Sequence, residues 1–485
     1  MKKPNVVMFL TDDQGAWALH CAGNDDIITP NLDQMAARGV RFENFFCASP
    51  VCSPARASIV TGRMPSAHGV HDWLNGGNVD TDKYPHMMGT PQFNKEDKAI
   101  EYLQGQVTYV EKLAEAGYHC GLSGKWHLGN NAMKKAGFEK WYALGHGGCN
   151  YKEPDVSDEG VMSSLTEYTT DLFTDKAIEY MTEWKDLEDP FYVSIHYNAP
   201  HSPWEIEHHK KEHLDLYKDC EFKATPVLPV HEFQIDSCPV GDTQEHRRAN
   251  LTGYYAAITA VDENVGKVYA FLEKHDLLDN TVVIFTADNG MNMGHHGVWG
   301  KGNGTYPPNM YEESIKVPCL IEAPFIKETG LVSTKVASHC DLFGTFMNIA
   351  GLDYKPGTYQ CGGSLYPYLC GEDTESKEIY MHDEYGFVRM IRTENYKLVY
   401  RYKGFESELY DLKHDIEETK NLYGDADYQE IVQEMLQKLE DWFITYTDPK
   451  FDAHLLEVTG KGQKDWCYKE DTFTQTYRYF HQKSI

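Results

Sequence analysis

The sequence is short of basic residues and has no long apolar segment. Its 485 residues include 45 Lys and Arg against 74 Asp and Glu, which gives a formal net charge of −29. A nucleic acid would meet a negative surface without the basic stripe that phosphate contacts require, so this class of partner is not expected. No run of about 18 apolar residues is present, and no membrane-spanning helix is expected.

The start of the chain also lacks the features of a secretory signal. Lys2 and Lys3 are followed by the apolar run 6–10, which is too short for a signal and ends in two aspartates without a small-residue cleavage site. The sequence as written is therefore expected to be cytoplasmic. The location would be periplasmic or secreted if a signal had been removed.

Closely spaced cysteine pairs are missing as well. The twelve cysteines are scattered without a C-x-x-C pair, so most are expected to be buried or inert thiols. Cys52 is different because of the residues around it. Internal repeats and low-complexity tracts are absent, and the 41% hydrophobic content is that of a folded chain.

Short apolar runs alternate with amphipathic stretches over most of the sequence. This alternation is typical of an α/β domain with a parallel sheet. Strands are predicted at 6–10, 118–122, 191–195 and 282–285, and helical spacing of apolar residues predicts helices at 31–38, 107–116, 171–184, 251–274 and 341–350.

The pattern changes near residue 375. Segments 388–391 and 396–402 predict antiparallel strands joined by the turn 393–395, followed by an amphipathic helix near 428–443. Residues 1–375 are therefore expected to form the main domain and 376–485 a smaller α+β subdomain. Aromatic residues near the end of the chain are expected to pack on another part of the protein: Trp466, Tyr468, Phe473, Tyr477, Tyr479 and Phe480.

Four of the predicted strands are followed by polar residues. These are Asp12 and Asp13, Asp288 and Asn289, Lys125 and His127, and the segment 198–201 that contains His201. The pair Asp12-Asp13 or the pair Asp288-Asn289, taken alone, would be interpreted as a solvated turn or an Asx cap. Open α/β sheets carry their sites at the carboxyl ends of their strands, however, and four such ends together favour a site. Three carboxylates and an amide oxygen are hard donors, which predict Ca²⁺ or Mg²⁺ rather than zinc.

A second candidate feature is the segment 50–58. Ser53 is a candidate N-cap and Pro54 suits a first helical turn, which would place Cys52 at a helix N-terminus with Arg56 one turn further on. An anionic group on residue 52 would be stabilised there by the helix amides and by the guanidinium. By spacing alone, a buried cysteine beside a capped helix is an equally good interpretation.

The residues Cys52-Ser53-Pro54-Ala55-Arg56 match the C-x-P-x-R motif of formylglycine-dependent sulfatases of the alkaline phosphatase superfamily, and Thr61-Gly62-Arg63 follows as expected. The resemblance extends from near the first residue to about residue 422, in the order of the family's motifs. It takes in segments 5–14, 29–33, 124–129, 198–203, 286–290, 311–318 and 408–412.

The resemblance implies a fold and an activity. The fold would be alkaline-phosphatase-like, with a central, mostly parallel sheet flanked by helices and a smaller C-terminal α+β subdomain that carries an antiparallel sheet. The activity would be hydrolysis of a sulfate ester to an alcohol and inorganic sulfate through a formylglycine-sulfate intermediate. A maturation enzyme would first convert Cys52 to formylglycine, whose hydrated aldehyde is the nucleophile in such enzymes.

The resemblance also assigns roles to residues. One Ca²⁺ would be held by Asp12, Asp13, Asp288, Asn289 and the converted Cys52. Fixed cations and a proton donor are what cleavage of a sulfate ester needs. Arg56 and Lys125 would hold the formylglycine hydroxyls, and Lys125 would also contact the sulfate. His201 and Lys301 would protonate the leaving group, and His127 would take the proton that restores the aldehyde.

Substrate-binding residues are expected next to the motifs in sequence. The substrate is expected to be a sulfated carbohydrate, because aromatic faces and acidic side chains suit sugar rings. Each candidate could equally be a packing residue, and His295 and His296 could simply be loop residues. The candidates are His68, His71, Asp72, Trp73, Trp204 and Trp299.

Two alternatives to a sulfatase remain open. The first is a phosphonate monoester or phosphodiester hydrolase, which in this superfamily uses the same scaffold. The second is a non-catalytic homologue that binds a sulfated glycan. No expected catalytic position is replaced in this sequence, which argues against the second.

Overall fold

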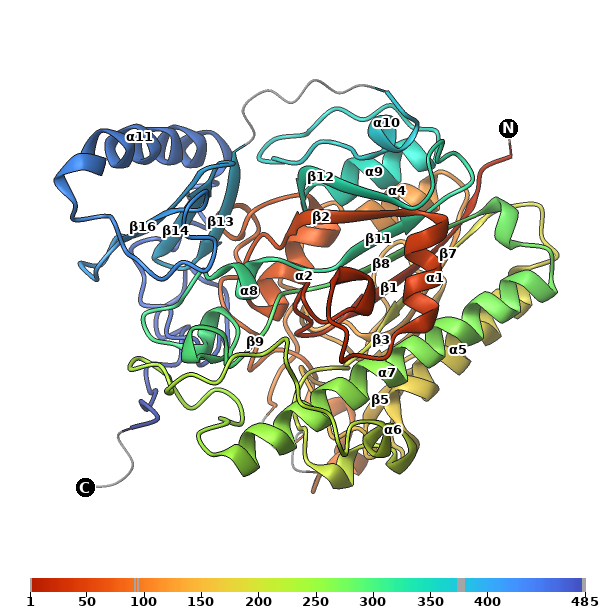
Figure 1. Cartoon of the computed structure of the whole chain (residues 1–485). Helices are drawn as coiled ribbons and strands as arrows, with labels where there is room; N and C mark the ends of the chain where they lie inside the picture. The colour runs from red at the N-terminus through yellow and green to blue at the C-terminus, as the bar shows by residue number, and fades with distance from the viewer. Residues whose placement is uncertain (1, 91–92, 94–95, 373–379, 482–485) are drawn as a thin grey trace.

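The computed structural model describes residues 2–90, 93, 96–372 and 380–481. Its central element is a ten-stranded sheet with the strand order β12-β2-β11-β8-β1-β7-β3-β4-β5-β6 (Figure 1). The strands are β1 (Asn5–Thr11), β2 (Val40–Phe46), β3 (His119–Lys125), β4 (Lys140–Leu144), β5 (Asp155–Asp158), β6 (Val161–Ser164), β7 (Phe191–His196), β8 (Thr281–Ala287), β11 (Cys319–Glu322) and β12 (Leu331–Ser338).

The four strands predicted from apolar runs are neighbours in this sheet. β8, β1, β7 and β3 run parallel to one another, so their carboxyl ends meet at one edge. Both faces of these strands are covered, which explains why they appear in the sequence as continuous apolar runs. Antiparallel pairs occur where β11 joins β2 and β8 and along β4-β5-β6. The expected α/β class with a mostly parallel sheet is confirmed.

Alternate side chains of β1 point into two different cores. Val7 and Phe9 pack in the core that contains α5 (Thr169–Trp184) and α7 (Gln244–Lys274), together with α1 (Pro30–Arg38). Val6 and Met8 pack in the core on the other face, with α2 (Cys52–Thr61), α4 (Tyr109–Glu115) and α9 (Asp341–Ile349). In Figure 1, α4 and α9 lie above the sheet and α5 and α7 below it.

The longest helix begins earlier than the sequence predicts. α7 starts at Gln244 rather than at 251, because Thr243 caps its first turn by accepting a hydrogen bond from the His246 amide at 3.1 Å. The remaining short helices and the two-stranded ribbon are α3 (Pro65–His68), α6 (Lys211–Leu216), α8 (Glu312–Ile315), α10 (Tyr366–Leu369), β9 (Asn292–Met293) and β10 (Trp299–Gly300). No helix in the described part of the chain combines the length and the apolar character that crossing a membrane requires.

The C-terminal part contains the expected antiparallel sheet and helix. The sheet has the order β13-β14-β15-β16, and the helix α11 packs its apolar face, with Met435 and Leu439, on Ile391 and Leu398. The proposed boundary between 375 and 376 lies outside the described residues. The elements are β13 (Met381–Tyr385), β14 (Val388–Arg392), β15 (Tyr396–Arg401), β16 (Glu408–Asp411) and α11 (Gln429–Tyr446).

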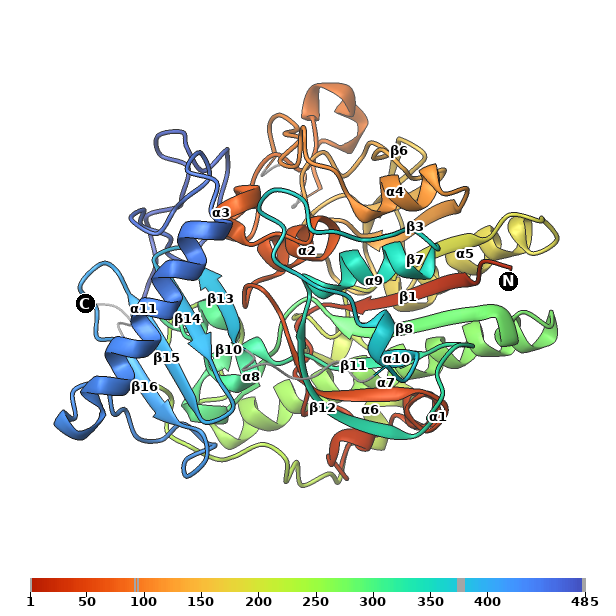
Figure 2. The same ribbon diagram turned by 90° about the horizontal axis from the view of Figure 1, so that it is seen from above.

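The chain beyond α11 returns to the main domain. We call residues 447–481 the C-terminal tail. Figure 2 shows the tail, in dark blue, beside α3, where the amide of Asp448 donates to the Ser66 carbonyl at 3.0 Å. Further along, the tail pairs with the loop after α3, and Tyr477 packs on Tyr306 with ring centroids 4.1 Å apart. The tail thus joins the small sheet to the main domain.

Gln463 is the centre of this junction. Its buried side chain accepts hydrogen bonds from the amides of His71 at 2.8 Å and Asp72 at 3.4 Å, and it donates to the carbonyls of Gly69 at 3.0 Å and Asp465 at 2.9 Å. All four partners are backbone groups. The side-chain amide therefore makes the hydrogen bonds that a neighbouring strand would otherwise make.

Gln463→Ala is expected to lower the free energy of unfolding by about 2 kcal/mol or more, because it leaves several buried backbone groups without partners. Urea denaturation followed by tryptophan fluorescence measures the change. Gln475→Ala is the matched control, since this exposed side chain makes a single contact within its own segment. Equal stability of the two variants would show that Gln463 does not hold the tail in place.

Candidate active site

Three carboxylates meet where the parallel strands end. β1 leads directly into Asp12 and Asp13, and β8 leads into Asp288 and Asn289. Asp12, Asp13 and Asp288 are buried, and their candidate ligand oxygens all lie within 4.8 Å of one another. Asp13 has a positive φ of 62°, a conformation that few non-glycine residues adopt and that turns the chain sharply at the strand end. The sheet edge therefore brings together the residues predicted there.

Each carboxylate faces a buried cation. Lys125 is paired with Asp12 and Lys301 with Asp13, while the Arg56 Nε atom lies 2.7 Å from Asp288 Oδ2. Burial works to raise the pKa of both Asp12 and Asp13, but the adjacent ammonium groups outweigh it and hold both values below the usual range.

Asp288 behaves differently from the other two carboxylates. Burial, together with the negative charge of Asp12, raises its pKa even though Arg56 is bound to it. Three carboxylates this close repel one another, so additional positive charge would stabilise the group.

The oxygen donors fit a hard divalent cation. Asp12 Oδ1 and Asn289 Oδ1 are buried, and neither has a hydrogen-bond partner among the described residues. The amide nitrogen of Asn289 donates to Asp13 Oδ1 at 2.9 Å, which fixes the side chain with its oxygen available. Carboxylate and amide oxygens are the ligands that Ca²⁺ and Mg²⁺ prefer.

Cys52 lies beside this cluster at the first residue of α2. The expectation that Ser53 caps the helix is wrong: the N-cap is Val51, without a side-chain hydrogen bond, and Ser53 Oγ instead accepts from the Leu74 amide at 3.1 Å. Burial raises the pKa of the Cys52 thiol, although Lys125 and Lys301 oppose the shift. As a thiol the residue is therefore neutral and a poor nucleophile.

Two histidines line the space in front of Cys52. The Nε2 atom of His127 lies 3.0 Å from the Leu74 carbonyl, which only accepts, so Nε2 carries the proton and the buried Nδ1 carries a lone pair. Burial, with Lys125 adding to it, lowers the pKa of His127 well below its usual value. His201 directs Nδ1 to the Ser202 carbonyl at 2.6 Å, and its Nε2 lies 3.7 Å from Asp13 Oδ2.

These groups form the floor of a cavity of about 340 Å³. Asp13, Cys52, His127, His201 and Lys301 all contribute to its wall. Arg56, Lys125 and Asp288 are buried next to this floor and do not line the cavity, and Asp288 Oδ1 accepts a hydrogen bond from the amide of the wall residue Asp13 at 3.2 Å. Arg56 also donates from Nη1 to the Lys125 carbonyl at 2.6 Å, and its buried Nη2 has no partner among the described residues.

The six expected substrate-binding residues do not share one environment. Trp73 lines the cavity, and its Nε1 donates to the Gly460 carbonyl at 3.1 Å. The other five are buried away from the described cavity wall, where their contacts support structural roles: His68 bonds to Ser58, His71 to the Phe451 carbonyl, Asp72 to Tyr385, Trp204 to the Pro200 carbonyl, and Trp299 packs in the core beside Met293.

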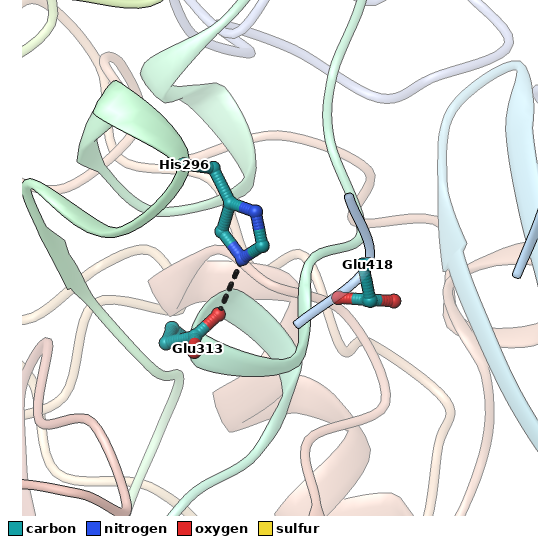
Figure 3. A group of neighbouring side chains, drawn as sticks. All are labelled: His296, Glu313 and Glu418. Carbon is teal, nitrogen blue, oxygen red and sulfur yellow. Dashed lines mark hydrogen bonds and ion pairs between the residues drawn. The ribbon is translucent and has the colours of Figure 1, made fainter. Parts of the chain in front are cut away.

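The loop histidines are also structural. His296 stacks on Tyr311 with ring centroids 3.9 Å apart, and its Nε2 lies 2.9 Å from Glu313 (Figure 3). Glu418 is the third member of this group, but its carboxylate is already paired with Lys397. His295 approaches the Ala224 carbonyl at 3.3 Å. Neither histidine lines the described cavity wall.

Sequence reasoning missed several residues of the cavity wall. Glu96 and His146 lie 3.3 Å apart there, and Asn303 and Lys461 line another part of it. None of them follows a predicted strand or belongs to a motif. They come from long loops and from the C-terminal tail, whose placement depends on tertiary contacts.

The comparison with protein families agrees with this geometry. The family described as Sulfatase matches residues 4–352, and the family described as N-sulphoglucosamine sulphohydrolase, C-terminal, matches residues 294–444. An N-acetylglucosamine-6-O-sulfatase of Bacteroides thetaiotaomicron is 29% identical over 524 aligned residues, covering 92% of this chain and 87% of the relative.

Solved structures share the whole fold. A solved structure described as a complex with its substrate D-glucosamine-2-N,6-O-disulfate superposes with a TM-score of 0.76 at 26% identity, covering 94% of this chain and 100% of the other. A phosphonate monoester hydrolase from Silicibacter pomeroyi has a TM-score of 0.70 at 19% identity, covering 96% of this chain and 100% of the other, which shows the fold alone. The chain belongs to the sulfatase family, and it is a sulfuric ester hydrolase.

Proposed function

We propose that the protein hydrolyses a sulfate ester of a sulfated carbohydrate, with residue 52 as the nucleophile after a maturation enzyme has converted Cys52 to formylglycine. The position of Cys52 carries this proposal. It is the first residue of α2, it lines the cavity, and Lys125 and Lys301 are close enough to influence the pKa of its thiol. The neutral thiol is a poor nucleophile, whereas a hydrated aldehyde at this position supplies a hydroxyl that attacks sulfur.

The three carboxylates and Asn289 are proposed to hold one Ca²⁺, with residue 52 as a further ligand. The free oxygens of Asp12 and Asn289 and the raised pKa of Asp288 support this assignment. Bound Ca²⁺ would supply positive charge to a sulfuryl oxygen. Arg56, through its unpartnered Nη2, is proposed to hold a hydroxyl of residue 52, and Lys125 and Lys301 are proposed to hold the sulfate.

The two histidines are proposed to move protons on opposite sides of the reaction. His127 presents the lone pair of Nδ1 and is kept neutral by burial, so it is suited to accept a proton from a hydroxyl of residue 52. His201 holds Nδ1–H at the Ser202 carbonyl, so its Nε2, which is directed towards Asp13 at the cavity wall, carries a proton in the imidazolium form; in that form it is suited, with Lys301, to protonate the oxygen of the leaving alcohol. The overall reaction consumes one water and releases an alcohol and sulfate.

The carbohydrate substrate is supported by the relatives and by the cavity wall. The Bacteroides thetaiotaomicron relative is an N-acetylglucosamine-6-O-sulfatase, and the substrate-bound structure holds a sulfated glucosamine. Trp73 supplies an aromatic side chain to the wall, and aromatic faces suit sugar rings. The phosphonate monoester hydrolase shares the fold, so phosphonate or phosphodiester hydrolysis is the second candidate function.

Cys52→Ala is expected to lower sulfate release by at least about a thousandfold, because it removes the nucleophile. The free energy of unfolding should change by only about 1 kcal/mol, since one buried heavy atom is lost. Sulfate release and thermal unfolding are measured on the same preparations, with Cys220→Ala, a half-buried thiol outside the cavity wall, as the control. Retained activity in Cys52→Ala would refute the proposed nucleophile.

Calcium is expected to stabilise the folded protein by about 2–3 kcal/mol at a concentration about a hundred times its Kd, because it binds the native state. Thermal unfolding with and without Ca²⁺, after chelation, measures the effect independently of activity. Asn289→Ala should reduce the shift, whereas Glu313→Gln, in the separate His296 cluster, should retain it. Loss of the shift in Glu313→Gln alone would move the calcium site to that cluster.

A substrate panel tests the reaction class. Matured protein is expected to release sulfate from at least one 6-sulfated amino sugar, and to act more slowly on an aryl sulfate, a phosphonate monoester and a phosphodiester. The values of kcat/KM on this panel, with Cys52→Ala as the blank, decide between the candidates. Turnover of the phosphorus esters alone would establish the second candidate function.

A further inference from the structure

A short turn of the C-terminal tail forms part of the cavity wall. Gly460 and Lys461 both line the cavity, and Gly462 follows. Gly460 and Gly462 have φ values of 79° and 111°, which side-chain-bearing residues rarely adopt. A Cβ atom on Gly462 would lie 2.3 Å from the side-chain Nδ2 atom of Asn75. We call residues 459–463 the tail turn.

The tail turn is fixed by side chains of the main domain. Trp73 Nε1 and Asn303 Nδ2 each donate to the Gly460 carbonyl at 3.1 Å, and Asn75 donates to the Lys461 carbonyl at 3.0 Å. The carboxylate of Asp72 accepts from the Gly462 amide at 3.0 Å. Because its backbone is bound on both sides of Lys461, the turn presents this side chain at a defined place on the wall.

The positive charge of Lys461 is not neutralised by an ion pair with any described residue. Among the described wall residues, Asp13 is paired with Lys301 and Glu96 with His146, whereas the Lys461 ammonium has no carboxylate within 4.0 Å. Its one hydrogen-bond partner within the described residues is the backbone carbonyl of Asp236.

Burial lowers the pKa of Lys461, and the exposed carboxylate of Asp236 offsets this only in part. A half-buried ammonium without a counter-ion is unfavourable unless an anion completes its surroundings. In a chain with a net charge of −29, such a cation on a cavity wall points to an anionic ligand.

We propose that Lys461 binds a second anionic substituent of the substrate, a sulfate or a carboxylate, in addition to the sulfate that is cleaved. This inference rests on the proposed function and adds a specificity residue to the same cavity. The ammonium retains two donors beyond its bond to the Asp236 carbonyl, so it is able to form a charge-assisted hydrogen bond to either group. The interaction would be the same before and during the reaction, so it would act on KM rather than on kcat.

The test compares three substrates: a 6-sulfated glucosamine, the same sugar with a second sulfate on nitrogen, and a sulfated disaccharide with a uronate carboxylate. For wild-type protein, kcat/KM should be higher on at least one doubly anionic substrate than on the singly sulfated sugar. Lys461→Met should lower that preference by about tenfold, mainly through KM, which is the effect expected for loss of one charge-assisted hydrogen bond. Lys461→Arg should retain most of it.

Lys464→Met is the matched control, because it removes the same charge from an exposed position of the same tail. It should leave the preference unchanged. Binding of the disulfated sugar to Cys52→Ala and to Cys52→Ala/Lys461→Met, measured by calorimetry, gives the same comparison without turnover. The loss caused by Lys461→Met identifies the group that Lys461 binds. A loss on the N-sulfated sugar indicates the second sulfate, and a loss on the uronate disaccharide indicates the carboxylate.

An unchanged preference in Lys461→Met, or an equal loss on all three substrates, would overturn the assignment of Lys461. In both cases sulfate release by the wild-type protein would leave the proposed function intact. Absence of sulfate release from every substrate by wild-type protein with confirmed conversion of Cys52 would instead overturn the proposed function itself.

Discussion

Close packing of like charge at the end of β1 and β8 is the constraint on which the rest of the site depends. Three buried carboxylates are stable only if positive charge surrounds them. The chain supplies that charge from three distant places, with Arg56 on α2, Lys125 at the end of β3 and Lys301 in the loop after β10. Cys52 is one turn of helix before Arg56, so the ion pair with Asp288 also fixes the position of residue 52.

The sequence predicts this part of the molecule well because it is determined locally and by strand order. The continuous apolar runs identified β1, β3, β7 and β8, and the polar residues after them had to meet once these strands proved to be parallel neighbours. The start of α7 was missed because its charged first turn has no apolar periodicity. The Ser53 cap was wrong because the hydroxyl has a tertiary partner, the Leu74 amide.

The cavity wall was much less predictable, for a physical reason. His71, Asp72, Trp204 and Trp299 are close to motifs in sequence, but their side chains are taken up by hydrogen bonds and packing behind the wall. Lys461 is hundreds of residues from any motif that it approaches. Its position follows from hydrogen bonds of Asn75, Asn303 and Trp73 to the tail backbone, and none of these is encoded by a periodic pattern.

The path of the tail has a consequence for the order in which the site is completed during synthesis. α2, with Cys52, leaves the ribosome long before residues 459–463 are made, because it precedes them by most of the chain described here. On the growing chain, the floor of the cavity can form while one of its walls does not yet exist. A sulfated sugar therefore meets a fully walled cavity only after residues 459–463 have been made and packed, whereas residue 52 passes through a long interval in which its surroundings are still open.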